Sequence, residues 1–169
     1  MRDYYFNQIE SYKKNKNKKI TIDKMPLNLV HVGEILRFFP NAKFILALRH
    51  PYDCVLSCFM QNFMLNHAMA NFLNLDDTLK LYDLTMSLWK KYTNVFKIDH
   101  HLIRYEDVVS NFKKTIGDLL KFLNVKWSDN VIEFYKTAEK RGIINTPSYN
   151  QVSQPIYYKS MYIWKNYEK

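Results

Sequence analysis

The stretch Phe44-Ile45-Leu46-Ala47-Leu48-Arg49-His50-Pro51-Tyr52-Asp53 decides the fold. Its first five residues form a continuous apolar run of strand length, which is typical of a strand buried on both faces of a parallel sheet. Arg49 ends this strand, and the residues from Asp53 to about Met64 predict a helix. We therefore expect a strand that leads into a helix, with a charged side chain where the two meet.

A second strand is predicted at His101-Leu102-Ile103-Arg104-Tyr105. Helices are expected around it at about 77–97, 106–124 and 129–139, the first of them capped by Asp77 and Thr78. Strands that alternate with helices at this spacing indicate an α/β fold with a parallel sheet flanked by helices.

The rest of the chain has weaker patterns. Residues 1–19 form a polar, lysine-rich N-terminal segment that we expect to be a helix followed by a loop. β-Branched residues make Ile20–Asp23 a predicted short strand. A helix is expected from Pro26 until Pro40 ends it. Residues 144–169 are turn-rich and then helical, and without an internal repeat or linker we expect a single domain over residues 1–169.

Composition excludes several classes of protein. Of the 169 residues, 47% are hydrophobic and 24% charged, with few Gly and Pro, so the chain is globular. It contains no apolar run long enough to span a membrane and no apolar signal core, so we expect a cytoplasmic protein. Cys54 and Cys58 lie one helical turn apart, without the second pair that a zinc site needs, so we expect buried helix residues and no metal.

The net charge of +9, from 25 basic and 16 acidic residues, suits a polyanionic partner such as nucleic acid or a phosphate-rich cofactor. Five of the basic residues lie in the lysine run 13–19, which a solvated loop also explains. A basic module that binds polyanions or nucleic acid without catalysis is therefore the alternative function. Lys and Arg are not interleaved with aromatic residues on one stripe, which makes nucleic acid the weaker choice.

Arg49 and Tyr105 each follow the carboxyl end of a predicted strand, so both should lie at the same rim of the sheet, where α/β proteins bind ligands. Ser57 lies about two turns into the helix after Arg49, and an Arg fork with a hydroxyl can hold one phosphate. Alternatively, Arg49 pairs with Asp53, Ser57 is only a small helix residue, and Tyr105 is a core aromatic.

Four segments, in order, resemble signatures of sulfotransferases that use PAPS (3′-phosphoadenosine 5′-phosphosulfate). They are Asp23-Lys24-Met25-Pro26-Leu27-Asn28, the stretch 39–57 with Arg49 and Ser57, Ile103-Arg104-Tyr105-Glu106-Asp107, and 146–164 with Thr146-Pro147-Ser148-Tyr149 and Trp164. The chain from about residue 20 onward is similar to the C-terminal part of bacterial sulfotransferases often joined to tetratricopeptide repeats, which are like tyrosylprotein sulfotransferases. The resemblance implies a P-loop-NTPase-like fold.

The resemblance also implies roles for individual residues. Arg49 and Ser57 would hold the 3′-phosphate, and Tyr105 would line the adenosine pocket. Lys24 would stabilise charge on the sulfuryl group as it moves to a hydroxyl acceptor, with protein tyrosine among the options. A loop would fold over the cofactor and border the sulfuryl group: Ser148, Tyr149, Gln151, Val152 and Pro155. Without the resemblance, Lys24 reads as a solvated lysine and Ser148 as a turn residue.

Some family features have no counterpart in the sequence. The Gly-rich phosphosulfate loop, the N-terminal strand before it and the usual catalytic carboxylate would all lie upstream of Asp23. Ile163 and Gln61 stand where relatives often carry a basic residue. We therefore expect a truncated or split form of the domain, with its N-terminal half on another chain or with self-association at the open sheet edge.

Overall fold

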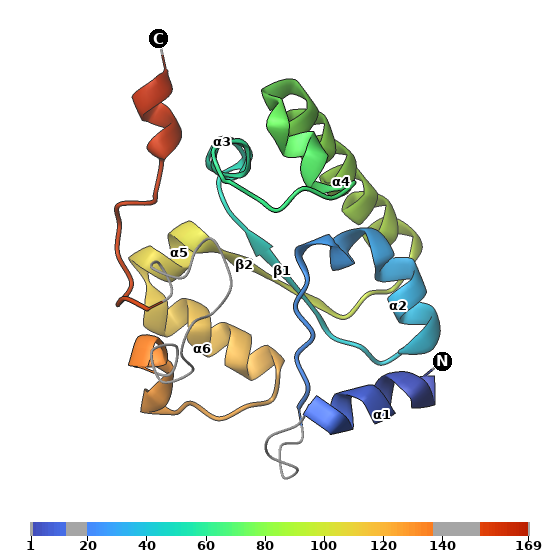
Figure 1. Ribbon diagram of the computed structural model, residues 1–169. Coiled ribbons are helices and arrows are strands. Elements are labelled where there is room, and N and C mark those ends of the chain that lie inside the picture. The colour runs from blue at the N-terminus through green and yellow to red at the C-terminus, as the bar shows by residue number, and fades with distance from the viewer. Residues whose placement is uncertain (1, 13–19, 137–152, 169) are drawn as a thin grey trace. The chain divides into compact units, whose positions relative to one another are not determined.

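The computed structural model describes residues 2–12, 20–136 and 153–168 (Figure 1). They fall into two compact units, each described by itself: Met1–Phe44 with Leu84–Asp99, and Ile45–Asp83 with His100–Lys169. The α-helices are α1 (Arg2–Tyr12), α2 (Val32–Phe38), α3 (Pro51–Phe59), α4 (Leu75–Val95), α5 (Tyr105–Ser110) and α6 (Phe112–Phe122). The 3-10 helices are η1 (Pro26–His31), η2 (Met69–Leu73), η3 (Asp129–Val131) and η4 (Ile163–Tyr167).

The first unit is helical, and in it the end of α4 lies close to η1 and α2. Tyr92 on α4 donates a hydrogen bond from its hydroxyl to the Val30 carbonyl (2.9 Å). A Cβ at Gly33 would lie 3.0 Å from the Tyr92 ring, so glycine permits this approach. In the part of this unit that the structure describes, the buried hydrophobic residues are Val32, Trp89 and Ile98.

The predicted strand at Ile20–Asp23 is wrong. These residues have no regular secondary structure, and the side chains of Ile20 and Ile22 are 49% and 71% exposed. β-Branched residues favour an extended chain, but a strand also needs a neighbour that pairs with its N–H and C=O groups. The described residues provide no such neighbour for this segment.

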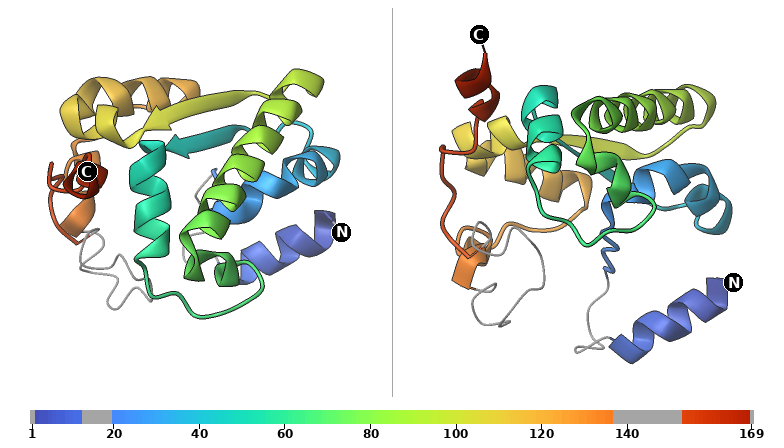
Figure 2. Two further views of the ribbon diagram at one scale, coloured as in Figure 1. Left: turned by 90° about the horizontal axis from the view of Figure 1, so that it is seen from above. Right: turned by 45° about the horizontal axis from the view of Figure 1, so that its top comes forward.

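The second unit contains the predicted sheet. β1 (Phe44–Leu48) and β2 (His100–Arg104) pair as two parallel strands, which confirms the α/β fold class. α3 continues from the end of β1, and α5 and α6 follow β2 and pack along it (Figure 2). Among its described residues, Val55 on α3 and Val109 on α5 are the buried hydrophobic ones.

The sheet is less buried than the apolar run at 44–48 predicts. Side chains along β1 alternate between half-buried and exposed, and Ile45 is 37% exposed. On β2, His101 stacks on Phe122 of α6, with 5.4 Å between the ring centres. Within the described residues α6 therefore covers β2, whereas Ile45 and Ala47 remain exposed.

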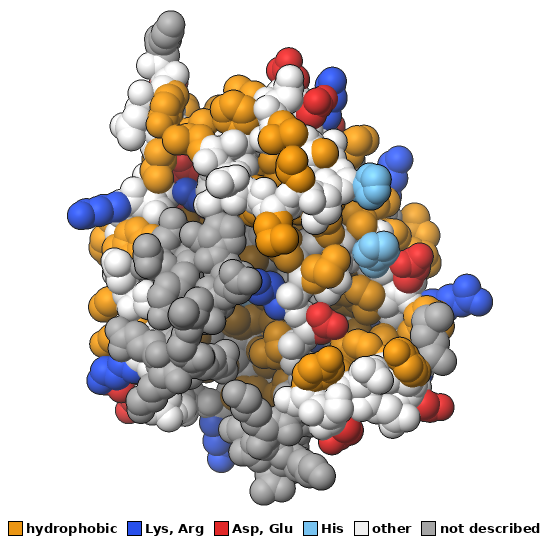
Figure 3. Space-filling model, in the orientation of Figure 1, with side chains coloured by type: hydrophobic (Ala, Val, Ile, Leu, Met, Phe, Trp, Pro, Cys, Tyr) orange, Lys and Arg blue, Asp and Glu red, His pale blue; other side chains and the backbone are white. Residues whose placement is uncertain are grey.

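Large hydrophobic side chains are exposed at many other described positions, and Figure 3 shows some of them in orange on the face in view. Of the helices that the structure describes, none has the length and apolar character needed to cross a lipid bilayer.

Several helix boundaries differ from the sequence prediction. α3 ends at Phe59, five residues before the predicted end at Met64. The helix expected over 106–124 is broken into α5 and α6 at Asn111, whose backbone has φ −147° and ψ 64°. Asn111 therefore ends one helix and precedes the next, which periodicity alone does not indicate.

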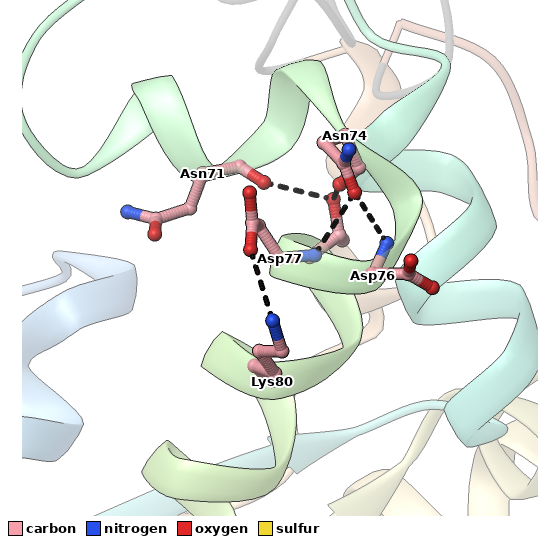
Figure 4. Close-up of polar contacts among 6 residues, drawn as sticks. Asn71, Asn74, Asp76, Asp77 and Lys80 are labelled. Carbon is pink, nitrogen blue, oxygen red and sulfur yellow. Dashed lines mark hydrogen bonds and ion pairs between the residues drawn. The ribbon is translucent and has the colours of Figure 1, made fainter.

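α4 begins at Leu75, so the predicted caps at Asp77 and Thr78 are wrong (Figure 4). The cap is Asn74, whose Oδ1 accepts hydrogen bonds from the backbone N–H groups of Asp76 (2.8 Å) and Asp77 (3.3 Å). Thr78 lies within the helix, 1% exposed, and its hydroxyl donates to the Asn71 and Asn74 carbonyls. An Asn side chain at this position satisfies N–H groups that a helix leaves unpaired.

Asn74→Ala should lower the free energy of unfolding by about 1 kcal/mol, because two N–H groups lose their acceptor. Asn74→Asp keeps an acceptor oxygen and should retain the stability. Urea denaturation followed by circular dichroism compares the three proteins. Equal stability of Asn74→Ala and the wild type would contradict this role of the cap.

Candidate functional site

Arg49 and Tyr105 meet at the carboxyl ends of β1 and β2, as the sequence predicts. The guanidinium carbon of Arg49 lies 5.6 Å from the centre of the Tyr105 ring, within the range of a cation–π contact. Arg49 Nη2 donates a hydrogen bond to the Ser160 carbonyl (2.7 Å), whereas its buried Nε has no hydrogen-bond partner among the described residues. Arg49 is thus oriented and keeps a donor free.

Tyr105 contacts the C-terminal segment as well. Its hydroxyl donates a hydrogen bond to the Tyr157 carbonyl (3.3 Å). Burial is the main cause that raises the pKa of Tyr105, so the phenol stays protonated and remains a donor at neutral pH.

Asp53 does not pair with Arg49, the alternative that the sequence left open. Its carboxylate is 1% exposed and accepts hydrogen bonds from the backbone N–H groups of Tyr162 (2.6 Å) and Trp164 (2.9 Å). Asp53 also lies in the first turn of α3, where the positive end of the helix dipole favours a negative charge. Its role is therefore to hold the C-terminal segment against α3.

An aromatic cluster surrounds the same rim. His50 stacks on Trp164 with 5.2 Å between ring centres and 13° between planes, and Tyr52 meets Trp164 edge-on at 5.1 Å. The backbone N–H of His50 donates to Glu106 Oε1 (2.8 Å), and Glu106 is only 5% exposed. A carboxylate from α5 thus fixes the turn between β1 and α3.

Buried polar atoms without partners gather in this region of the described structure. They are Arg49 Nε, His50 Nδ1, Trp164 Nε1 and Glu106 Oε2. Arg104 Nε lies 4.0 Å from Glu106 Oε2, an ion pair too long to be a hydrogen bond. Proteins leave few buried polar atoms unpaired, and the unpaired donor of Arg49 is suited to an anionic or polar ligand.

The other predicted site residues are placed as follows. Ser57 lies on α3 and is exposed, two turns beyond Arg49. Pro155 is exposed in the segment that precedes Tyr157. Lys24 is exposed and belongs to the first unit, so its role rests on the sequence. The remaining residues lie outside the described part of the chain: Ser148, Tyr149, Gln151 and Val152.

Sequence reasoning did not identify Asp53, His50, Glu106 or Trp164 as parts of the site. All four lie within the segments that carry the family resemblance, and this was the only signal available. Their partners are distant in the chain, so spacing could not assign them.

Cys54 and Cys58 lie on α3 as predicted, but they are half-buried and not buried. A hydrogen bond from Cys58 lowers the pKa of Cys54 to about 7, with a smaller contribution from the charge of Arg49. The same bond raises the pKa of Cys58. No group of three or more His, Cys, Asp or Glu residues that could hold a metal occurs in the described parts of the chain.

Comparison with known proteins identifies the family. The model of the Sulfotransferase family matches residues 1–129, which includes the β1–α3 stretch and β2 with Tyr105. The chain belongs to this family. The match also takes in α1, which lies upstream of the four segments that carry the family signatures.

The chain is also similar to individual curated proteins and to a solved structure. The chain is 27% identical over 153 residues to Protein-tyrosine sulfotransferase 1 of Danio rerio, covering 84% of this chain and 41% of that protein. It is 33% identical over 152 residues to an uncharacterized protein of Aquifex aeolicus, covering 88% of this chain and 19% of that protein. The solved Sulfotransferase Domain from the Curacin Biosynthetic Pathway shares the fold, with a TM-score of 0.69 and 18% identity.

The chain spans less than half the length of these curated relatives. The match to the solved domain covers 99% of this chain and 62% of that domain. The sulfotransferase fold is therefore present here in part.

Alkylation by iodoacetamide tests the cysteine pair. Because the thiolate is the nucleophile and its pKa is lowered, Cys54 should react increasingly as the pH rises through about 7. Cys58→Ala removes the hydrogen-bond donor and should move this profile to higher pH, toward the ordinary thiol value. Mass spectrometry of the labelled peptide measures the rate. An unchanged profile in Cys58→Ala would show that the hydrogen bond does not control Cys54.

Proposed function

We propose that this chain is part of a PAPS-dependent sulfotransferase, which moves a sulfuryl group from PAPS to a hydroxyl acceptor. The observation that carries the proposal is the orientation of Arg49. Its guanidinium lies at the carboxyl rim of the sheet, oriented by the Ser160 carbonyl and the Tyr105 ring, with a buried donor that has no described partner. Family membership supplies the reaction class.

The residues present fit the 3′-phosphate end of the nucleotide. A phosphate oxygen is a strong acceptor for the unpaired Arg49 Nε, and the positive charge of Arg49 balances the phosphate. Ser57, exposed on α3, can add a hydroxyl donor. The aromatic ring of Tyr105 offers an apolar face to the adenosine.

When bound, PAPS supplies the activated sulfuryl group, and the chain's own residues bind and stabilise charge. Lys24 is proposed to place a cation near the equatorial oxygens of that group, where charge is stabilised during transfer. Ser148, Tyr149, Gln151, Val152 and Pro155 are proposed to form a loop that covers the nucleotide. The proposed donor is PAPS alone, without a metal.

We propose protein tyrosine as the acceptor class. The support is the name of the Danio rerio relative, Protein-tyrosine sulfotransferase 1, which matches 84% of this chain.

We further propose that residues 1–169 form one part of a single sulfotransferase domain. Two observations support this: the solved domain is longer than this chain, and the described sheet has only two strands, with Ile45 and Ala47 uncovered. Edge strands pair readily with further strands, so the remainder of the domain would complete the sheet, from the same polypeptide or from another.

A thermal-melt titration with PAP, the desulfated nucleotide, tests the binding site. PAP at about 100 times its dissociation constant should stabilise the wild type by about 2.7 kcal/mol. Arg49→Ala should abolish this shift because it removes the charged fork. Arg37→Ala is the matched control, since it removes the same charge from an exposed position on α2 and should retain the shift.

Each contrary outcome has a definite meaning. If Arg37→Ala and Arg49→Ala reduced the PAP-induced stabilisation equally, and PAP binding depended steeply on salt, the alternative of a general polyanion-binding module would be favoured. The absence of a shift at millimolar PAP, in a protein that melts cooperatively, would contradict nucleotide binding by this chain.

Lys24→Ala tests the proposed catalytic cation in a reconstituted full-length enzyme. Turnover should fall by about 10²-fold, as when one group that stabilises transition-state charge is removed, while PAP affinity changes little. Sulfate transfer to a tyrosine peptide and PAP binding are measured on the same preparation. Equal losses in turnover and affinity would assign Lys24 to binding and not to catalysis.

A further inference from the structure

We propose that Asp53 is a positioning residue for the nucleotide site: by holding the turn at Tyr162 and Trp164, it presents the Ser160 carbonyl to Arg49 and so orients the guanidinium for the 3′-phosphate. The inference rests on the proposed nucleotide binding and adds a residue that does not touch the ligand. It makes the C-terminal segment part of the machinery that prepares the site.

The first step is the burial of the carboxylate. Asp53 is 1% exposed, and each of its two oxygens accepts one backbone N–H, Oδ2 from Tyr162 and Oδ1 from Trp164. A buried carboxylate is tolerated only when hydrogen bonds replace its hydration. The two N–H groups are therefore tied to Asp53, and the turn that carries them is tied to α3.

The second step is the conformation of that turn. Tyr162 has φ 56° and ψ 32°, the left-handed region that a residue with a side chain rarely adopts. Such a conformation persists when the surroundings hold it in place. The N–H groups of Tyr162 and Trp164, on either side of Ile163, both point to Asp53, which supplies that constraint.

The third step connects the turn to Arg49. Ser160 lies two residues before Tyr162, and its carbonyl accepts the hydrogen bond from Arg49 Nη2 at 2.7 Å. Tyr105, whose ring faces the guanidinium, bonds to the Tyr157 carbonyl in the same segment. A shift of this segment would therefore change both contacts that orient Arg49.

The orientation of Arg49 matters because a guanidinium binds phosphate through a planar fork with fixed donor directions. The hydrogen bond from Nη2 to Ser160 uses one of the five N–H groups of the guanidinium, and the ring of Tyr105 lies against it, so other donors, the unpartnered Nε among them, remain for a ligand. If the segment were released, Arg49 would have to be ordered at the moment of binding, which lowers affinity.

Asp53→Asn is the variant that tests the proposal. Asn keeps the size of the side chain but replaces one acceptor oxygen with an NH₂ group, which would face a backbone N–H. The dissociation constant for PAP should rise by about 3- to 30-fold, the range of couplings carried through neighbouring residues. Affinity for 5′-AMP, which lacks the 3′-phosphate, should be unchanged.

Thr78→Val is the matched control for stability. Thr78 is also 1% exposed and bonded to backbone groups, but its partners are the Asn71 and Asn74 carbonyls at the start of α4. Thr78→Val should lower the melting temperature and leave PAP affinity unchanged. A fall in PAP affinity equal to that of Asp53→Asn would show that lost stability alone is responsible and would overturn the proposal.

Hydrogen exchange of the wild type tests the same proposal if Asp53→Asn does not fold. Peptides that cover residues 157–164 should exchange more slowly with saturating PAP than with 5′-AMP. Equal exchange with the two nucleotides would overturn the proposal. If Asp53→Asn bound PAP as tightly as the wild type while Arg49→Ala lost PAP binding, the proposal would be overturned and nucleotide binding would stand. If the wild type did not bind PAP, the proposed function itself would be rejected.

Discussion

The buried carboxylate of Asp53 connects two segments that are far apart in the chain, and the arrangement of the rim depends on it. Taking a carboxylate out of water costs several kcal/mol unless hydrogen bonds replace the lost hydration. Here two backbone N–H groups, at 2.6 and 2.9 Å, provide them. The same bonds hold Tyr162 in a left-handed conformation that would otherwise cost about 1–3 kcal/mol. The two hydrogen bonds therefore offset both the burial of the charge and the strain of the backbone at one place.

A second buried carboxylate complements the first. Glu106 accepts the backbone N–H of His50 and so joins the start of α5 to the turn before α3. Asp53 and Glu106 both lie in the first turn of a helix, where the helix dipole favours negative charge. Arg49 directly precedes His50, bonds to Ser160 in the segment that Asp53 holds, and has the Tyr105 ring against its guanidinium. The rim thus holds one oriented cation whose free donor suits the phosphate of a nucleotide.

The rim lies at the end of a small sheet in the described part of the chain. The described sheet has two strands, and among the described residues of the second unit the buried hydrophobic ones are Val55 and Val109. The solved sulfotransferase domain is matched over 62% of its length. The side chains of Ile45 and Ala47 on β1 are exposed, so this strand is less buried than the apolar run 44–48 predicts.

The sequence by itself determined the two strands, the α/β class and the meeting of Arg49 with Tyr105. An apolar run of strand length such as 44–48 is typical of a strand in a parallel sheet. The carboxyl ends of parallel strands share one edge, which brings Arg49 and Tyr105 together. The predicted strand at Ile20–Asp23 was wrong, because local preference cannot supply a pairing partner. The predicted continuous helix across Asn111 was also wrong, because periodicity does not reveal a break between helices. Only the tertiary structure decided the partners of Asp53, which lie 109 and 111 residues away in the chain. A backbone N–H has the same chemistry at every position, so the fold alone selects which two of them a buried carboxylate receives.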